Sequence, residues 1–375
     1  MSLPMAGSRS MTPSAPRARA PGRLPARTLA LILAPALFVI VVLSLRQGTS
    51  GVRELADVGR GLLALLGLGA PLAGSEQTIV ELRLFRVVTA AGVGAGLALS
   101  GGLLQGVFRN DLASPAVIGI SAGASLGASL AILVVGGYVP LFMLEGASGL
   151  SPLFVSASAF LFALAVAWLV TALATTDGRI SVPTLLLVGI AMNALIAGLL
   201  ATLQSLVLDQ FEVARALISW TFGTLDDRSA YHALLMAGGL ALSAAAIPFV
   251  SVELDLFAGG EEDAQGLGVD TRRVKLVALT AASLAAATAV SVAGQIAFIG
   301  LIVPHLLRLV IGRSHRALLG LCLLGGPVLL LGTDLLKRTV LGDAWYLPPG
   351  VVMSLVGGPF FLMLLMRNRR ALQAW

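Results

Sequence analysis

The stretch that decides the fold runs from Arg83 to Gly127 and reads RLFRVVTAAGVGAGLALSGGLLQGVFRNDLASPAVIGISAGASLG. Two apolar runs without charges flank a short polar cluster, RND at 109–111, and Gln105 lies one helical turn before it. Polar groups are costly at membrane depth unless they are paired, and those that occur there are usually functional. The stretch therefore predicts two membrane helices joined at a functional turn.

A second stretch has the same character. Residues 294–316 read GQIAFIGLIVPHLLRLVIGRSHR. The spacing from Gln105 to Pro115 is close to the spacing from Gln295 to Pro304. This similarity suggests two inverted four-helix repeats, helices 2–5 and 7–10, an arrangement common in transporters.

The composition assigns the chain to the polytopic membrane proteins. It is 57% hydrophobic and 12% charged, with a mean hydropathy of +0.94, whereas soluble domains are about 45–50% apolar and about 25% charged. The single cysteine, Cys322, excludes an internal disulfide framework and a thiolate-rich metal site. A net charge of +6 could suggest nucleic acid, but the basic residues follow membrane topology instead.

We expect an all-α fold with ten transmembrane helices. A span needs about 17–25 apolar residues. The runs without Asp, Glu, Lys or Arg are Leu29–Leu45, Val87–Phe108, Leu112–Leu144, Gly146–Thr176, Ile180–Leu208, Ser229–Val252, Leu276–Leu307, Ala317–Thr333 and Ala344–Met366. The seventh run, continued to Gly312, holds two spans because Gly294 and Gln295 break it.

The basic residues predict that both termini are cytoplasmic. With the N-terminus inside, sixteen Lys and Arg residues fall on the cytoplasmic side and nine fall outside. Residues 1–28, basic and without an acid, are expected to form a disordered cytoplasmic tail, and residues 29–370 one permease domain. A cleavable signal peptide is the alternative, but the run from Leu29 to Leu45 is long for one and offers no small-x-small cleavage site. Short helices are expected outside, within 46–82 and 209–228.

One motif raises an enzymatic alternative. Gly119 to Gly123 matches G-x-S-x-G, which on a strand-to-helix turn would present Ser121 as a nucleophile. Here it lies in an apolar helical run, and neither His232 nor His305 has an obvious orienting partner. An intramembrane serine protease therefore ranks below a transporter. The three histidines and one cysteine show no spacing typical of a metal site.

The chain lacks its own energy source. It has no P-loop motif, and no carboxylate lies mid-span, where an ion-coupled secondary carrier would need one. Asp334 comes closest and falls at a helix end. A transporter of this kind requires a separate ATPase, so the chain is expected to be a membrane subunit without catalytic residues or cofactors.

Over about residues 76–367 the two quoted stretches resemble the ten-helix permeases of the ABC importers for iron chelates (siderophore or haem) and cobalamin. The sequence departs from that family at Phe85 and Asp111, where proline is usual. The resemblance implies a type II ABC importer permease fold and a homodimer with the pore between two copies. It also implies two ATPase subunits, a periplasmic substrate-binding protein and the bacterial inner membrane. An iron complex is the first expected cargo and cobalamin the second.

The candidate residues for the translocation path or gate are Gln105, Arg109, Asn110, Asn193, His305 and Arg308. Arg109 is either a snorkelling arginine or, as the resemblance implies, orders the turn beside the path. For Asn193 an interhelical hydrogen bond and pore lining remain equally open. His305 could donate to a carbonyl freed by Pro304, fix or gate a helix, or contact an iron complex.

The longest cytoplasmic loop, about residues 253–270, holds the candidate ATPase-coupling segment. Its stretch GEEDAQGLG (260–268) resembles the coupling segment of the family, in which a short helix enters a groove on the ATPase. Gly268 is expected to turn the chain at positive φ. The candidate coupling residues are Glu261, Ala264, Leu267 and Gly268. On the outside, the resemblance places Lys337 and Arg338 where the binding protein docks.

Overall fold

The computed structural model describes residues 24–47, 54–135, 151–177, 179–340 and 347–367. The expected tail, residues 1–28, lies almost wholly outside these ranges. The helices are α1 (Ala26–Arg46), α2 (Leu55–Leu65), α3 (Glu76–Phe108), α4 (Ile120–Val135), α5 (Ser151–Leu173), α6 (Val182–Leu206), α7 (Phe211–Phe222), α8 (Ala230–Ala244), α9 (Ile247–Leu256), α10 (Glu261–Gly266), α11 (Thr271–Ala293), α12 (Ile299–Ile311), α13 (His315–Val340) and α14 (Pro349–Arg367). Short 3₁₀ turns add η1 (Pro115–Ile118) and η3 (Phe257–Gly259).

The expected spans correspond to these helices. Among the described residues, six helices are long and apolar enough to cross a membrane, and α8 and α9, bent by 47° at their junction, are so as a pair. Three shorter apolar helices, α4, α12 and α14, account for the remaining expected spans. The all-α prediction is confirmed, apart from a hairpin of two-residue strands, β1 (Thr175–Thr176) and β2 (Arg179–Ile180).

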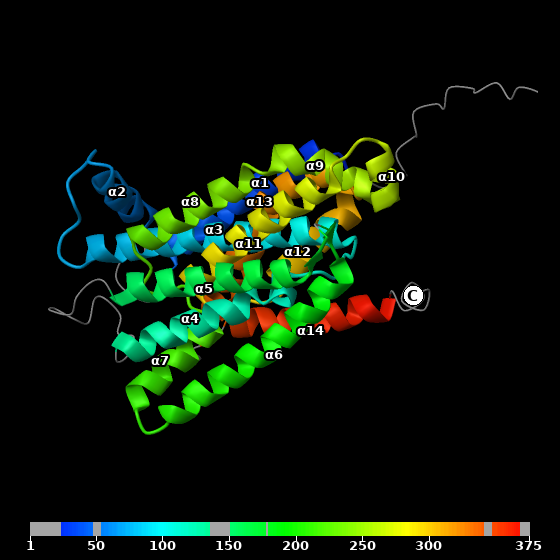
Figure 1. The fold of residues 1–375 in the computed structure, drawn as a ribbon. Coiled ribbons are helices and arrows are strands. Elements are labelled where there is room, and N and C mark those ends of the chain that lie inside the picture. Colours follow the sequence, from blue (N-terminus) through cyan, green and yellow to red (C-terminus); the bar gives the residue numbers. More distant parts are fainter. Residues whose placement is uncertain (1–23, 48–53, 136–150, 178, 341–346, 368–375) are drawn as a thin grey trace, which may run out of the picture.

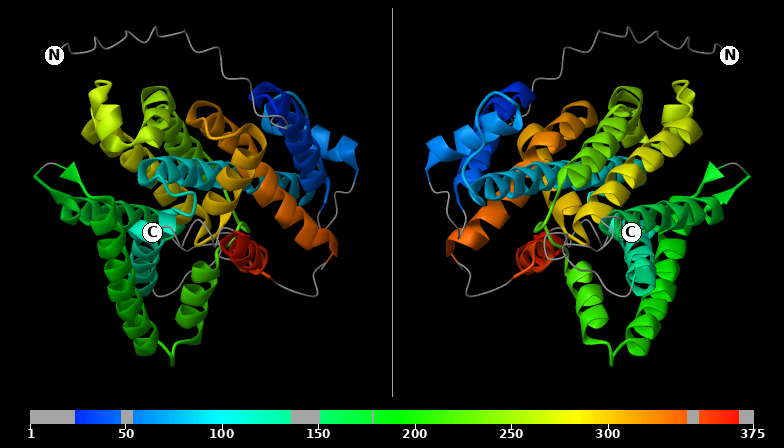
Figure 2. Two further views of the ribbon diagram at one scale, coloured as in Figure 1. Left: turned by 90° about the vertical axis from the view of Figure 1, so that its right-hand side faces the viewer. Right: turned by 90° about the vertical axis from the view of Figure 1, so that its left-hand side faces the viewer.

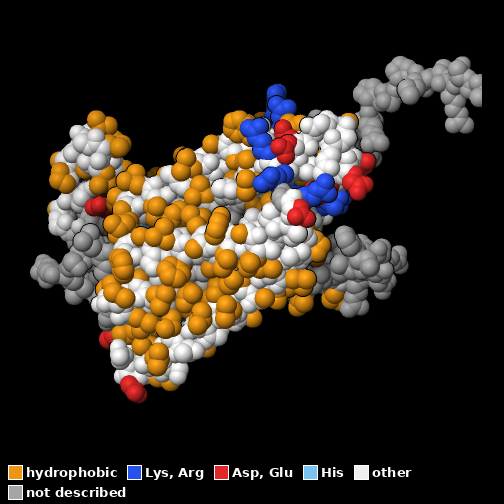
Figure 3. Space-filling model, in the orientation of Figure 1, with side chains coloured by type: hydrophobic (Ala, Val, Ile, Leu, Met, Phe, Trp, Pro, Cys, Tyr) orange, Lys and Arg blue, Asp and Glu red, His pale blue; other side chains and the backbone are white. Residues whose placement is uncertain are grey.

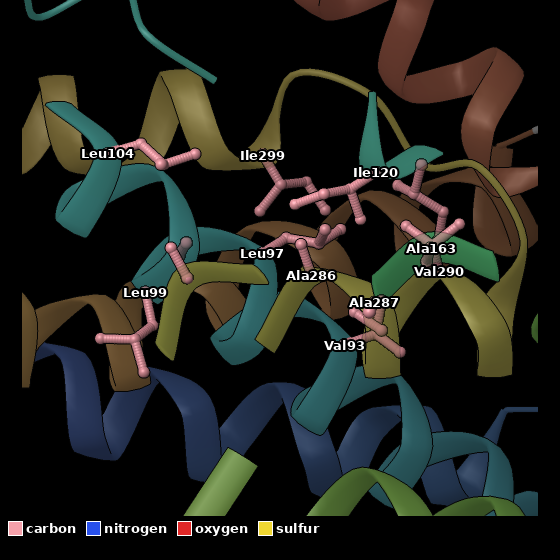
Figure 4. Packing of buried hydrophobic residues seen from close by; sticks show 14 of the residues in the cluster. Val93, Leu97, Leu99, Leu104, Ile120, Ala163, Ala286, Ala287, Val290 and Ile299 are labelled. Atoms are coloured by element: carbon pink, nitrogen blue, oxygen red, sulfur yellow. The ribbon is translucent and has the colours of Figure 1, made fainter. Parts of the chain in front are cut away.

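Helix α3 forms the centre of the bundle. In its most apolar window 83% of the residues are buried, because α11, α12 and α13 surround it. Small residues permit this packing: an added Cβ on Gly94 would lie 2.5 Å from the carbonyl oxygen of Gly326. Where hydrophobic burial cannot drive association, close backbone contact takes its place. Figure 4 shows the side chains of α3, α11, α12 and α4 interlocking at this centre.

The two repeats have matching breaks and opposite directions. α3 ends at Phe108 and is followed by Arg109, whose φ of 50° is left-handed, and an irregular segment with η1 leads into the short α4. α11 ends before Gly294, and residues 294–298 lead into the short α12. In Figure 1, α3 runs toward the end that carries α10, whereas α11 runs away from it. This arrangement is that of inverted repeats.

The bundle has two ends, which we name by their short helices. The α10 end carries η3, α10, the α3–η1 turn and the α12–α13 turn, and the α7 end carries α2 and the loop between α7 and α8 (Figure 1). The backbone N–H of Leu24 donates to the Val310 carbonyl oxygen at 3.1 Å, so α1 begins at the α10 end. α14 finishes at the same end (Figure 1). Figure 2 shows α6 and α7 as a V that points away from α1.

Candidate substrate path and coupling surface

A cavity of about 490 Å³ opens at the α10 end, and we call it the Arg308 cavity. Its lining comes from the ends of α3, α9 and α12, the start of α6 and the turns beside them. The lining residues are Gln105, Gly106, Phe108, Arg109, Asn110, Asp111, Leu112, Val182, Pro183, Leu186, Leu254, Ala258, Arg308, Arg313 and His315. The structure thus brings four of the six path candidates together: Gln105, Arg109, Asn110 and Arg308.

The end of α3 positions the first three of these residues. The left-handed conformation of Arg109 turns the chain, and the backbone N–H of Asn110 donates to the Gln105 carbonyl at 3.2 Å. The Asn110 side-chain oxygen accepts from the backbone N–H of Leu112 at 2.9 Å. The Gln105 amide nitrogen lies 3.4 Å from the Gly300 carbonyl oxygen, which joins the last turns of α3 to the start of α12. Local turn chemistry and one contact between the repeats therefore build this wall.

Arg308 is held by residues that the sequence analysis did not propose as site residues. Its Nη1 donates to Asp111 Oδ1 at 2.8 Å, and its Nη2 lies 3.3 Å from His315 Nε2. His315 Nδ1 lies 2.9 Å from Asp255 Oδ1 on α9. Asp111 was the one residue of this set that stood out in the sequence, as a position where the related permeases usually have proline. At that position the carboxylate supplies the counter-ion of Arg308.

Two path candidates lie elsewhere. Asn193 Nδ2 donates to the Ala116 carbonyl at 3.0 Å, so the interhelical hydrogen bond is present at α6 and η1. His305 is buried beside Phe360 of α14, with ring centroids 6.2 Å apart. Its Nδ1 has no hydrogen-bond partner among the described residues. His305 was expected to donate to a carbonyl freed by Pro304. Its Nδ1 makes no such hydrogen bond to a described residue, because the ring turns toward α14.

The second histidine of the protease alternative has a structural role. His232 Nδ1 accepts from the backbone N–H of Ser229 at 3.3 Å and completes a capping box at the start of α8. Its Nε2 lies 2.7 Å from the Tyr231 hydroxyl. His232 therefore pairs with residues at the start of α8 and not with Ser121.

The predicted coupling segment folds as η3, α10 and a glycine turn. Gly268 has a φ of 86°, as expected, and its backbone N–H donates to the Gln265 carbonyl at 2.9 Å. Leu267 is 71% exposed, whereas Ala264 is fully buried against the bundle. The Ala264 side chain therefore seats α10 on the bundle. Glu261 accepts from Lys275 Nζ at 2.7 Å and ties α10 to α11.

A polar groove of about 700 Å³ lies between α10 and the β1–β2 hairpin, and we call it the α10 groove. Figure 3 shows basic and acidic side chains gathered at this end, while the middle of the molecule is largely apolar. The lining residues are Arg109, Thr176, Arg179, Ile180, Ser181, Gly259, Gly260, Glu261, Glu262, Asp263, Gln265 and Lys275. Arg109 lines both hollows, so the coupling segment and the Arg308 cavity share a wall.

At the α7 end, Arg338 does not stand at an exposed mouth as expected. Its side chain is 18% exposed, pairs with Asp334 at 2.9 Å, and donates to the Gln47 carbonyl at 3.1 Å and the Ser44 carbonyl at 3.4 Å. It therefore caps the end of α1, where carbonyl groups lack intrahelical partners. Lys337 precedes it on the last turn of α13.

Asp334 is the hub of this cluster. Its side chain is 1% exposed and accepts from Arg86 Nη2 at 2.7 Å, while Arg86 also contacts Asp226 in the loop before α8. Beside the cluster, burial raises the pKa of the Asp227 carboxyl, and Arg228 and Arg86 oppose that shift. Asp334, the candidate for an ion relay, is thus held between Arg86 and Arg338, which is typical of a structural ion-pair cluster.

Comparisons with known proteins agree with this architecture. The sequence profile of the FecCD transport family matches residues 35–367. The cobalamin import system permease protein of Halobacterium salinarum is 39% identical over 311 residues, covering 82% of this chain and 79% of that protein. The hemin transport system permease protein of Yersinia pestis is 38% identical over 291 residues, covering 77% and 83%. The Fe(3+)-citrate import system permease protein of Bacillus subtilis is 34% identical over 335 residues, covering 89% and 93%.

A solved structure shares the fold. A metal-chelate type ABC transporter in an inward-facing conformation superposes with a TM-score of 0.73 at 27% identity, covering 91% of this chain and 99% of that one. Its likeness extends over both repeats, and the profile match covers more than half of the sequence. This chain therefore belongs to the FecCD transport family and is a membrane-spanning permease subunit of an ABC importer, with ATP hydrolysis carried out by a separate subunit.

Proposed function

We propose that this permease moves an iron complex, a ferric siderophore or haem, from the periplasm to the cytoplasm. The observation that carries the proposal is the Arg308 cavity itself, where the break after α3 in the first repeat meets the end of α12 in the second, one wall away from the α10 groove. Irregular backbone at membrane depth is tolerated where it lines a cavity, and transporters place their substrate paths there. Motion at the coupling segment can therefore reach the path directly.

The same geometry supports the proposed partners. The permease lies in the bacterial plasma membrane. Two ATPase subunits bind the exposed part of its coupling segment, around Leu267 and Gly268. A second copy of this chain completes the pore, with α6 facing it: 17% of the most apolar window of α6 is buried within this chain. Membrane lipid covers the remaining apolar surface, and α10 with both termini lies in the cytoplasm. ATP hydrolysis by the ATPase subunits then opens the substrate path alternately to the periplasm and to the cytoplasm.

The cargo is tested by reconstitution. Proteoliposomes with the permease, its ATPase and its binding protein are expected to take up radioactive iron as a chelate or haem only when ATP is present. Uptake of cobalamin in place of iron would favour the alternative cargo, which a relative also carries in its name. Uptake driven by an ion gradient without the ATPase would contradict the importer assignment.

The orientation gives a separate prediction. Reporters fused after Gln47, Gly146 and Asp226 are expected to be periplasmic, and those after Thr176, Gly260 and Ser314 cytoplasmic, because Lys and Arg favour the cytoplasmic side sixteen to nine. Gly146 lies outside the described residues. Cysteine labelling from each side of the membrane measures the same topology independently. Cytoplasmic labelling at Asp226 would contradict ten spans.

Docking of the binding protein at the end of α13 gives another prediction. We expect Lys337→Glu to weaken capture of the loaded binding protein by about two- to fivefold, because an exposed charge pair contributes about 0.2–1 kcal/mol. The loss should shrink with added salt, and it is measured by binding at two ionic strengths. Arg338→Glu is a poorer probe, since it would place a second carboxylate beside Asp334 and disturb the cap of α1. An unchanged affinity at low salt would remove Lys337 from the interface.

A further inference from the structure

The Arg308 cavity has a cationic lining. Three arginines face it, Arg109, Arg308 and Arg313, against one carboxylate, that of Asp111. His315 turns its Nε2 toward Arg308 and is held from behind by Asp255, which does not line the cavity. Cavities that bind small ligands measure about 300–1,000 Å³, and this one, at about 490 Å³, falls within that range.

Two buried polar atoms in the lining lack a partner among the described residues. The Arg308 side chain is 8% exposed, and its Nε makes no hydrogen bond. Gln105 is 1% exposed, and its Oε1 makes none either. The Gln105 amide cannot be reversed without cost, because its nitrogen faces the carbonyl oxygens of Gly300 and Ala113. Buried groups of this kind are normally paired, so this part of the lining keeps one unsatisfied donor and one unsatisfied acceptor.

Asp111 already occupies part of the position that such a ligand would take. Its carboxylate lies 2.8 Å from Arg308 Nη1 and 3.7 Å from Arg313 Nη2, and its side chain remains 34% exposed. It follows the left-handed turn at Arg109, so it sits on a loop rather than within a helix. A carboxylate from the cargo would find the same two arginines.

We propose that the Arg308 cavity is an anion-binding site for carboxylate groups of the cargo, with Asp111 as an internal competitor. A carboxylate on the cargo pairs with Arg308 and Arg313 and displaces Asp111. The return of Asp111 then releases the cargo toward the cytoplasm, since a transport site must bind weakly enough to let its ligand leave. The inference rests on the proposed function and narrows its cargo to chelates that carry carboxylates.

The test uses the full transporter in lipid nanodiscs without nucleotide. Ala258 lines the cavity and is exposed, so Ala258→Cys provides a site for maleimide labelling, and the native Cys322 is buried. The probes are citrate, its neutral triethyl ester and inorganic phosphate. Citrate is expected to protect the introduced cysteine in a salt-sensitive manner, and the ester is expected not to.

Variants give the sharper result because the two partners of one ion pair should act in opposite directions. In the labelled background, Arg308→Gln should weaken citrate protection by about tenfold or more, as hydrogen bonds to buried charged groups do. Asp111→Asn should strengthen it, by about two- to fivefold, because the competitor is gone. Arg313→Gln should weaken it by about two- to threefold, and the matched variant Arg316→Gln, three residues away and outside the lining, should leave it unchanged.

A merely structural ion pair predicts that Arg308→Gln and Asp111→Asn both reduce protection, and that outcome would overturn the inference. Equal protection by citrate and its ester, protection by neither, or stronger protection by phosphate would overturn it as well. Iron uptake by the same preparations is measured separately. If ATP-driven iron uptake persists while citrate fails to protect, the anion site is wrong and the importer function stands.

Discussion

Gly268→Trp is expected to uncouple transport from ATP hydrolysis while leaving the permease folded. Gly268 adopts a φ of 86°, and an added Cβ would meet nothing within 4 Å, so the side chain itself has room in this chain. The backbone strain costs about 1–2 kcal/mol. The bulk of the indole, next to the exposed Leu267, falls where the ATPase is proposed to dock. Uptake in proteoliposomes should drop by more than about tenfold, equivalent to a loss of about 1.4 kcal/mol in coupling.

Two control variants separate the causes. Gly268→Ala introduces the strain without the bulk and should retain most of the transport. Gly238→Trp adds the same bulk to open space on α8, away from the coupling segment, and should transport like the wild type. Stimulation of ATP hydrolysis by the loaded binding protein is measured beside uptake. Wild-type uptake by Gly268→Trp with an intact ATPase response would show that this loop does not couple the two subunits.

The second large effect is expected for Gly101→Ala, at the crossing of α3 and α12. An added Cβ would overlap the carbonyl group of Gly300, and that group is backbone, so no side-chain rotation can relieve the clash. Overpacking in a core usually costs about 1–3 kcal/mol, and a fixed backbone clash belongs at or above the upper end of that range. Thermal unfolding of the detergent-solubilised permease should therefore begin at a clearly lower temperature.

The matched control is Gly320→Ala on α13, where an added methyl group meets nothing within 4 Å. Alanine favours helix by about 1 kcal/mol over glycine, so this variant should be neutral or slightly more stable. Gly101 also lies one turn before Gln105, so a misplaced crossing would disturb the wall of the Arg308 cavity. Equal melting temperatures for the two variants would contradict the prediction, because they would show that α3 and α12 can move apart at Gly101 without loss of stability.

Much of the fold could be predicted because a membrane simplifies the problem. Apolar runs of sufficient length must become helices when no water can pair with the backbone. Glycine, proline and short polar runs mark places where a helix cannot continue. For this reason the sequence predicted the break at Gly294, the turn after α3 and the positive φ of Gly268. Arg109 and Asn110 lie at one such break, Gln105 lies on the last turn of α3, and all three line the Arg308 cavity.

The partners of those residues were decided by the tertiary structure alone. Asp111 and Arg308 are 197 positions apart, and only the crossing of α3 and α12 brings them within 2.8 Å. Arg338 was expected at an exposed mouth, yet the end of α1 lies against α13 and offers it unpaired carbonyl groups. Ala264 was proposed as a coupling residue, and only the fold shows that it lies on the side of α10 that packs on the bundle. Sequence by itself determined where helices form and break, because those choices depend on local polarity and backbone freedom. Which polar side chains meet depended on helix crossings, because pairing requires two distant segments to approach within a few ångströms.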